Sequence, residues 1–118
     1  MEECYRPPTT EEDRLKAGLA VHMAAARTGG RPDRIFEGGR LDPRTSKTRW
    51  LAMYLSHIVF GWPLERVADV FGLNRSTAAA ACRWVEDARD DPALDDLLGQ
   101  LEGCIHALYR VPSCELAR

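Results

Sequence analysis

The amino-acid sequence predicts an all-helical protein, a bundle of about five helices. Apolar residues recur at spacings of three and four along most of the chain, as they do in helices with one buried face. Glycine and proline interrupt this pattern at intervals that suit short turns. No segment of useful length alternates between apolar and polar residues, as a half-buried strand does.

The first helix is expected over residues 11–27. Thr10 is its predicted N-cap, because three acidic residues follow it and would complement the positive end of the helix dipole. Three apolar residues recur there at a spacing of four: Leu15, Leu19 and Met23. The Gly29–Gly30 pair should end the helix. Residues 28–44 are rich in Gly, Pro and Arg and are expected to form a loop that Ile35–Phe36 attaches to the core.

A second helix is expected over residues 47–60, with Thr45–Ser46 as its N-cap after Pro43. Its apolar residues form a broad stripe on one face: Trp50, Leu51, Tyr54, Leu55, Ile58 and Val59. Gly61 should end this helix, and Pro63 suits the first turn of the next one.

The third helix should point Leu64, Val67, Ala68 and Phe71 inward and end at Gly72. After Leu73, a fourth helix is expected from residue 74 or 75 to 89, with Ala78, Ala81, Cys82 and Val85 inward. Asp90–Asp91–Pro92 should break the chain before a last helix over residues 92–109. That helix carries Leu94, Leu98, Leu101, Ile105 and Leu108 at helical spacing.

Three segments follow from this pattern. Residues 1–44 are expected to form an arm, a helix and a basic linker. Residues 45–110 are expected to form a helix-turn-helix domain with a C-terminal helix, and residues 111–118 a frayed tail.

Charge is distributed unevenly, although the net charge is only −2. Residues 27–49 hold seven basic and three acidic side chains, a local charge of +4. Residues 86–102 hold seven acidic side chains and only Arg89 against them, a local charge of −6. A surface that faces phosphate needs local positive potential rather than a positive total, so nucleic-acid binding remains compatible with this composition.

Several function classes are not expected. The four cysteines and three histidines are scattered without metal-ligand spacing, so we predict reduced thiols, no metal and no cofactor. No nucleophile has an evident general base, so no catalytic residue and no enzyme is expected. No apolar run suggests a membrane span, and the acidic N-terminus is unlike a secretory signal. A cytoplasmic, nucleoid-associated protein is therefore predicted.

Residues 63–85 have the lengths of a helix-turn-helix, in which the second helix enters the major groove. That helix begins with Asn74–Arg75–Ser76–Thr77, side chains that are able to contact bases or phosphates. Four alanines, Ala78 to Ala81, keep its first turns slim. The same pattern also fits a plain helical hairpin in which the polar residues only cap the helix.

Residues from about 45 to 87 resemble the C-terminal duplex-binding domain of the bacterial replication initiator DnaA. Three pieces carry the resemblance: the basic segment before Ala52–Met53–Tyr54–Leu55, the Leu64…Val67–Ala68…Phe71–Gly72 helix, and Asn74–Arg75–Ser76–Thr77 followed by Ala81–Cys82–Arg83. The family's signature at the recognition helix is commonly Arg-Asp-His-Thr-Thr, and here it is Leu73–Asn74–Arg75–Ser76–Thr77. The two hydroxyls are retained, whereas Leu73–Asn74–Arg75 argues against the initiator's own binding box.

The resemblance implies a DNA-reading module in which Arg49 belongs to a basic loop that enters the minor groove. There is no phosphate loop of an ATPase. Stand-alone modules of this kind resemble the activators of gene transfer agent or prophage-like clusters, the GafA/GafY type. The candidate DNA-binding residues are Arg44, Ser46, Lys47, Arg49, Leu73, Asn74, Arg75, Ser76, Thr77 and Ala80.

The expected function is that of a sequence-specific, double-stranded DNA-binding transcriptional regulator, an activator, present as a monomer or homodimer. The acidic residues 86–102 are either a solvated face or a surface for RNA polymerase, a sigma-like factor or a DNA-bending protein. Two alternatives stay open: a replication-initiation regulator that competes at initiator boxes, and a protein-interaction module that has lost DNA binding.

Overall fold

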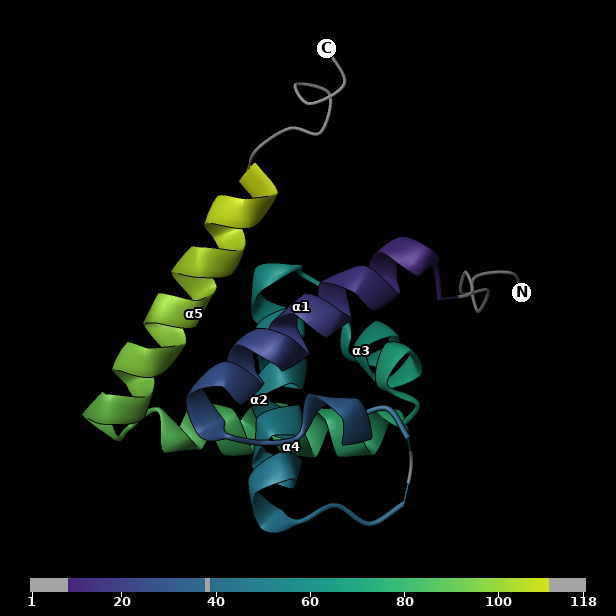
Figure 1. Ribbon diagram of the computed structural model, residues 1–118, viewed down its shortest axis with the longest axis horizontal. Coiled ribbons are helices and arrows are strands. Elements are labelled where there is room, and N and C mark those ends of the chain that lie inside the picture. The colour runs from purple at the N-terminus through teal and green to yellow at the C-terminus, as the bar shows by residue number, and fades with distance from the viewer. Residues whose placement is uncertain (1–8, 38, 111–118) are drawn as a thin grey trace.

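A computed structural model describes residues 9–37 and 39–110, and it confirms the predicted all-α fold within that part of the chain (Figure 1). The elements, in chain order, are α1 (Glu11–Thr28), the short 3-10 helix η2 (Pro32–Arg34), α2 (Pro43–Val59), α3 (Leu64–Phe71), α4 (Arg75–Ala88) and α5 (Pro92–Arg110). Helix α2 runs through the middle of the bundle, and α4 crosses it near its first turns (Figure 1). Among the described helices, none is long and apolar enough to cross a bilayer.

Helix α1 begins as predicted, but its most deeply buried residues are not the predicted apolar series: Leu19 and Met23 are only partly buried. The Thr10 hydroxyl accepts a hydrogen bond from the Asp13 amide, and the Asp13 carboxylate accepts one from the Thr10 amide, which completes a capping box. Leu15 is 65% exposed. The buried face consists of small residues, Ala17, Ala20, Val21 and Ala24. These short side chains let the α1 backbone approach α2 closely, which leucines would prevent.

Helix α2 begins four residues earlier than predicted, at Pro43. Its N-cap is Asp42 rather than Thr45–Ser46, and the Asp42 carboxylate accepts a hydrogen bond from the Thr45 amide. Thr45 is instead fully buried, and its hydroxyl accepts a hydrogen bond from the Arg31 amide. The expected division at residue 44 therefore falls inside a helix, and the Gly- and Pro-rich loop is attached to the first turns of α2.

The loop before α2 is anchored by an apolar pair, as expected. Ile35 is buried, and the Phe36 ring stacks on Phe71 of α3 with centroids 5.1 Å apart. Gly30 lies against the Thr48 side chain, where a Cβ atom would collide with the threonine. The close approach of the loop to α2 therefore requires glycine at this position.

The other helices bury most of the residues that their spacing predicts, with two exposed exceptions, Ile58 of α2 (47% exposed) and Leu108 of α5. All four predicted inward residues of α4 are buried: Ala78, Ala81, Cys82 and Val85. In α5, Leu98, Leu101 and Ile105 are buried, but Leu108 lies one turn beyond them and is 57% exposed.

The described cysteines are free thiols. Cys82 is buried, and burial raises the pKa of its thiol to about 11, whereas Cys104 is exposed. Cys4 and Cys114 lie outside the described residues. Within residues 9–37 and 39–110, no group of histidine, cysteine and carboxylate side chains is arranged to hold a metal ion.

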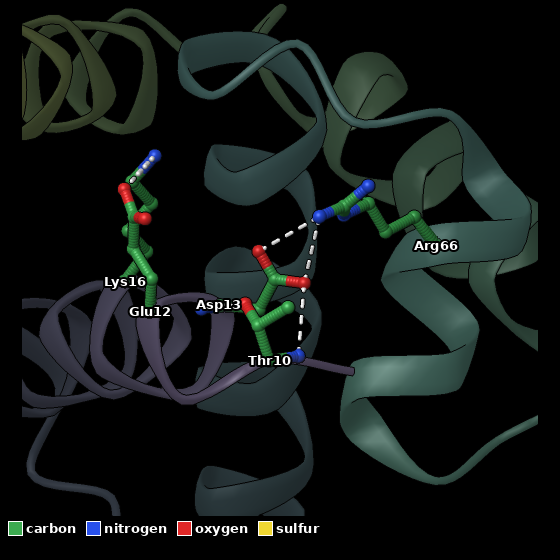
Figure 2. A network of polar contacts seen from close by, with 5 residues as sticks. All are labelled: Thr10, Glu12, Asp13, Lys16 and Arg66. Atoms are coloured by element: carbon green, nitrogen blue, oxygen red, sulfur yellow. Dashed lines mark hydrogen bonds and ion pairs between the residues drawn. The ribbon is translucent and has the colours of Figure 1, made fainter. Parts of the chain in front are cut away.

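An ion pair with a buried carboxylate joins the start of α1 to α3 (Figure 2). The Arg66 guanidinium donates to both carboxylate oxygens of Asp13, at 2.8 and 3.0 Å. Asp13 is only 4% exposed. Burial alone would raise the pKa of this carboxyl, but the hydrogen bonds from Arg66 and Thr10 outweigh it, and the pKa lies below its ordinary value. Figure 2 also shows the neighbouring pair of Glu12 and Lys16, which is exposed at the carboxylate.

Replacing Asp13 with Asn is expected to lower the free energy of unfolding by about 1–2 kcal/mol, because Arg66 loses its charged partner. The loss is smaller than for a fully buried pair, since 38% of the Arg66 side chain is exposed. The pKa of Asp13 is lower in the folded than in the unfolded state. Its stabilisation is therefore fully present above the unfolded-state pKa, about 4, and is lost as the pH falls through the lower pKa of the folded state.

Chemical denaturation of wild type, Asp13→Asn and the control Glu12→Gln between pH 7 and pH 2 measures this effect. The Asp13 variant should approach wild type as the pH falls, whereas the Glu12 variant should stay close to wild type throughout. Equal stability of all three at pH 7 would contradict a stabilising role for the pair.

Candidate nucleic-acid interface

The connection between α3 and α4 is a tight turn of residues 72–74. Gly72 has a φ of +71°. The Leu73 amide donates to the Ala68 carbonyl at 2.8 Å, and the Gly72 amide donates to the Asp69 carbonyl at 3.3 Å, the hydrogen-bond pair of a Schellman motif. Leu73 is half-buried and packs against the core. Its role here is to end α3, and the turn places the start of α4 at the surface.

Asn74 caps α4 and holds the two hydroxyl side chains of the first turn. Its Oδ1 atom accepts hydrogen bonds from the Thr77 amide and hydroxyl, both at 2.9 Å, and from the Ser76 hydroxyl at 2.8 Å. Asn74 and Ser76 are exposed, and Thr77 is half-buried. The first amide groups of a helix have no partner within it, so this end of α4 suits an anionic ligand.

Arg75, the first residue of α4, is paired with α3. Its Nε atom lies 3.2 Å from the Glu65 carboxylate, and both side chains are exposed, by 59% and 44% respectively. Exposed ion pairs contribute about 0–1 kcal/mol, so a phosphate or a guanine could displace the carboxylate. Glu65 is a residue that the sequence pattern did not single out.

The prediction of a basic loop is wrong, because the residues assigned to that loop lie in helix α2. Arg44, Ser46, Lys47 and Arg49 all lie within the helix that Asp42 begins. Arg44 and Lys47 are exposed, and Ser46 is half-buried. The loop that does precede α2 has part of its charge neutralised locally, since Arg31 pairs with Asp33 and Arg34 pairs with Glu37.

Arg49 is not placed as the resemblance implied. Its side chain is half-buried, and its Nε atom is shielded from solvent without a hydrogen-bond partner among the described residues. Burial lowers its pKa, although an arginine stays charged at neutral pH. Insertion of Arg49 into a minor groove would require this side chain to leave its present site. Arg44 and Lys47 are therefore the residues of this group that present positive charge to a ligand.

Two tryptophans join α2 to α4 beside these residues. The rings of Trp50 and Trp84 have centroids 4.9 Å apart and are tilted by 60°. A shallow hollow on one side is lined by Trp50, Ser76, Thr77, Ala80, Ala81 and Trp84. A second hollow is lined by Thr28, Asp42, Pro43, Arg44, Lys47, Leu51, Trp84 and Leu94.

The two hollows adjoin at Trp84, and we call them together the α2–α4 face. Ser76, Thr77 and Ala80 line the hollow on one side of Trp84, and Arg44 and Lys47 line the hollow on the other. Arg75 and Asn74 stand at the edge of this face, at the start of α4. The sequence offered a signal for Trp84, which follows Ala80 by one helical turn and therefore shares its face. The contact with Trp50 had no such signal.

The acidic residues gather at the other end of α4. Arg89 binds Asp95 at 2.6 Å, Glu102 at 2.7 Å and the Tyr54 hydroxyl at 3.0 Å. Burial would lower the pKa of Arg89, but these hydrogen bonds raise it above its ordinary value. The remaining acidic residues are exposed: Glu86, Asp87, Asp90, Asp91 and Asp96. Helix α4 has 14 residues, so its acidic end lies about 20 Å from its N-terminus.

The chain matches no protein-family model, and it has no significant match among curated proteins or among solved structures. The geometry of the α2–α4 face is therefore the basis for assigning a function.

If this face binds duplex DNA, replacing Glu65 with Gln is expected to strengthen that binding about two- to five-fold at low salt, because it frees Arg75 and removes a negative charge beside it. Fluorescence anisotropy with a labelled duplex measures the change. Glu12→Gln removes the same charge from an exposed pair on α1 and is the matched control. An equal gain in both variants would mean that net charge, rather than the Glu65–Arg75 pair, sets the affinity.

Proposed function

We propose that this protein binds double-stranded DNA sequence-specifically through the α2–α4 face and acts as a transcriptional regulator, an activator. The observation that carries the proposal is the exposed first turn of α4, whose Ser76 and Thr77 line a hollow that adjoins, at Trp84, the hollow lined by Arg44 and Lys47. The resemblance of residues 45–87 to the duplex-binding domain of DnaA adds to it.

In the proposed complex, the start of α4 enters the major groove. Arg75 is suited to guanine, Asn74 to adenine, and the hydroxyls of Ser76 and Thr77 to phosphate or a base edge. Both hydroxyls now donate to Asn74, so DNA binding would exchange those hydrogen bonds for contacts with the duplex. Ala80 leaves room for the groove wall one turn further along α4.

Arg44 and Lys47 are proposed to contact the phosphate backbone beside the groove. Two such contacts are few, so we expect weak affinity for a single module and steep salt dependence. A dimer, repeated sites or a DNA-bending protein would add affinity in the cell.

The acidic end of α4 supports a further part of the proposal. DNA would repel Glu86, Asp87, Asp90, Asp91 and Asp96, so these residues are expected to face away from the duplex. They would be available to RNA polymerase, a sigma-like factor or a DNA-bending protein. This exposed acidic cluster also favours the second candidate function, a protein-interaction module without DNA binding.

The double substitution Arg75→Ala with Ser76→Ala is expected to weaken binding to the preferred duplex about 10- to 100-fold, because it removes a base contact and a hydroxyl contact. Anisotropy with a duplex selected from a randomised pool measures the loss. Circular dichroism checks that the variant is folded. Unchanged affinity of a folded variant would show that the start of α4 is not the reading element.

Genome-wide immunoprecipitation separates the proposal from its rivals. Sharp peaks upstream of promoters that vanish in the double variant would support a transcriptional regulator. Peaks at the replication origin would favour a replication-initiation regulator instead. No peaks from stably expressed protein would favour the protein-interaction module.

A further inference from the structure

The hollow beside the start of α4 has a mostly apolar lining. Four of its six lining residues are apolar: Trp50, Ala80, Ala81 and Trp84. The other two are Ser76 and Thr77, and both hydroxyls already donate their hydrogen to Asn74 Oδ1. A group that enters this hollow therefore meets mostly apolar surface.

Trp84 is held in place although it is exposed. It is 39% exposed, a large apolar side chain left facing solvent on the outer side of α4. Its contact with the Trp50 ring, 4.9 Å between centroids, ties it to the central helix. An aromatic wall that is fixed before binding loses little conformational entropy when a ligand reaches it.

We infer that this hollow receives the C5-methyl group of a thymine in the major groove, and that Trp84, supported by Trp50, is the residue that reads it. The inference rests on the proposed function. Two observations place the methyl group there. Ser76 and Thr77, proposed to enter the groove, line the same hollow. On the other side of Trp84, Arg44 and Lys47 line the second hollow. Their positive charge would suit the phosphates of the strand that carries the base.

The chemistry of the groove identifies the ligand. Thymine alone among the four DNA bases carries a methyl group on its major-groove edge, and apolar side chains recognise it by contact. Cytosine carries no methyl group at this edge, so it would lose the apolar contact that thymine makes. The hollow would therefore select thymine over cytosine without a direct hydrogen bond to the base.

Replacing thymine with uracil tests the inference, because it removes only the methyl group. A duplex is first selected from a randomised pool with the whole chain, and it is then remade with uracil at each thymine in turn. At one thymine, or at two adjacent ones, uracil should weaken wild-type binding about four-fold, the value of one buried methyl group. The Trp84→Ala variant should bind the thymine and uracil duplexes equally.

Two further variants make the result decisive. Ala80→Gln fills the hollow from an exposed helix position and should also abolish the preference for thymine, so the test stands even if Trp84→Ala fails to fold. Leu15→Ala removes an exposed leucine on α1 and should keep the full four-fold preference.

The possible failures are distinct. Wild-type protein that binds its selected duplex but is indifferent to uracil at every thymine overturns this inference and leaves the proposed function intact. A preference for thymine that survives in both Trp84→Ala and Ala80→Gln places the methyl group elsewhere and also overturns it. If no duplex is selected at all, the proposed function fails and this inference fails with it.

Discussion

Six consecutive residues of α2, from Leu51 to Ser56, are buried, which requires other elements on every side of this helix. Helices α1, α3, α4 and α5 all contact it. The buried hydroxyl in this run is satisfied within the helix, since Ser56 donates to the Ala52 carbonyl at 2.9 Å. The exposed Arg44 and Lys47 lie in the first turns of α2. They line a hollow with Trp84, in the second half of α4.

The ends of α4 have opposite character, and this polarity orients the molecule. At its start, Asn74 gathers hydroxyl and amide groups into one exposed cap. At its end, acidic side chains accumulate, and Arg89 draws two of those carboxylates toward Tyr54 of α2. A polyanion would therefore be attracted to one end of the helix and repelled from the other. The overall negative charge of the chain does not conflict with a local anion-binding surface.

Sequence periodicity predicted the helices well where a single face is buried. In α4 it identified all four buried residues, and the caps at Thr10 and Asn74 followed from ordinary N-cap preferences. Sequence periodicity and capping preferences failed where the cap or the buried face depends on how the helices pack. Both Asp42 and Thr45 are good N-caps, and burial of the Thr45 hydroxyl against the Arg31 amide decided between them. In α1, alanines and Val21 form the fully buried face, Leu19 and Met23 pack at its margin, and Leu15 is exposed.

The candidate site was predictable only in part, for the same reason. The start of α4 was evident from its residue types, whereas the Glu65–Arg75 pair and the Trp50–Trp84 contact depend on how helices cross. The half-buried position of Arg49 likewise depends on how α2 packs against its neighbours.

The most direct test of the α2–α4 face as a duplex-binding surface is a titration of the isotope-labelled chain with duplex DNA, followed by NMR of the backbone amides. The account predicts the largest shifts at Asn74 to Thr77, Ala80, Arg44 and Lys47, with Asp90 to Asp96 unaffected. Shifts centred on the acidic end of α4, or none at any duplex concentration, would contradict it.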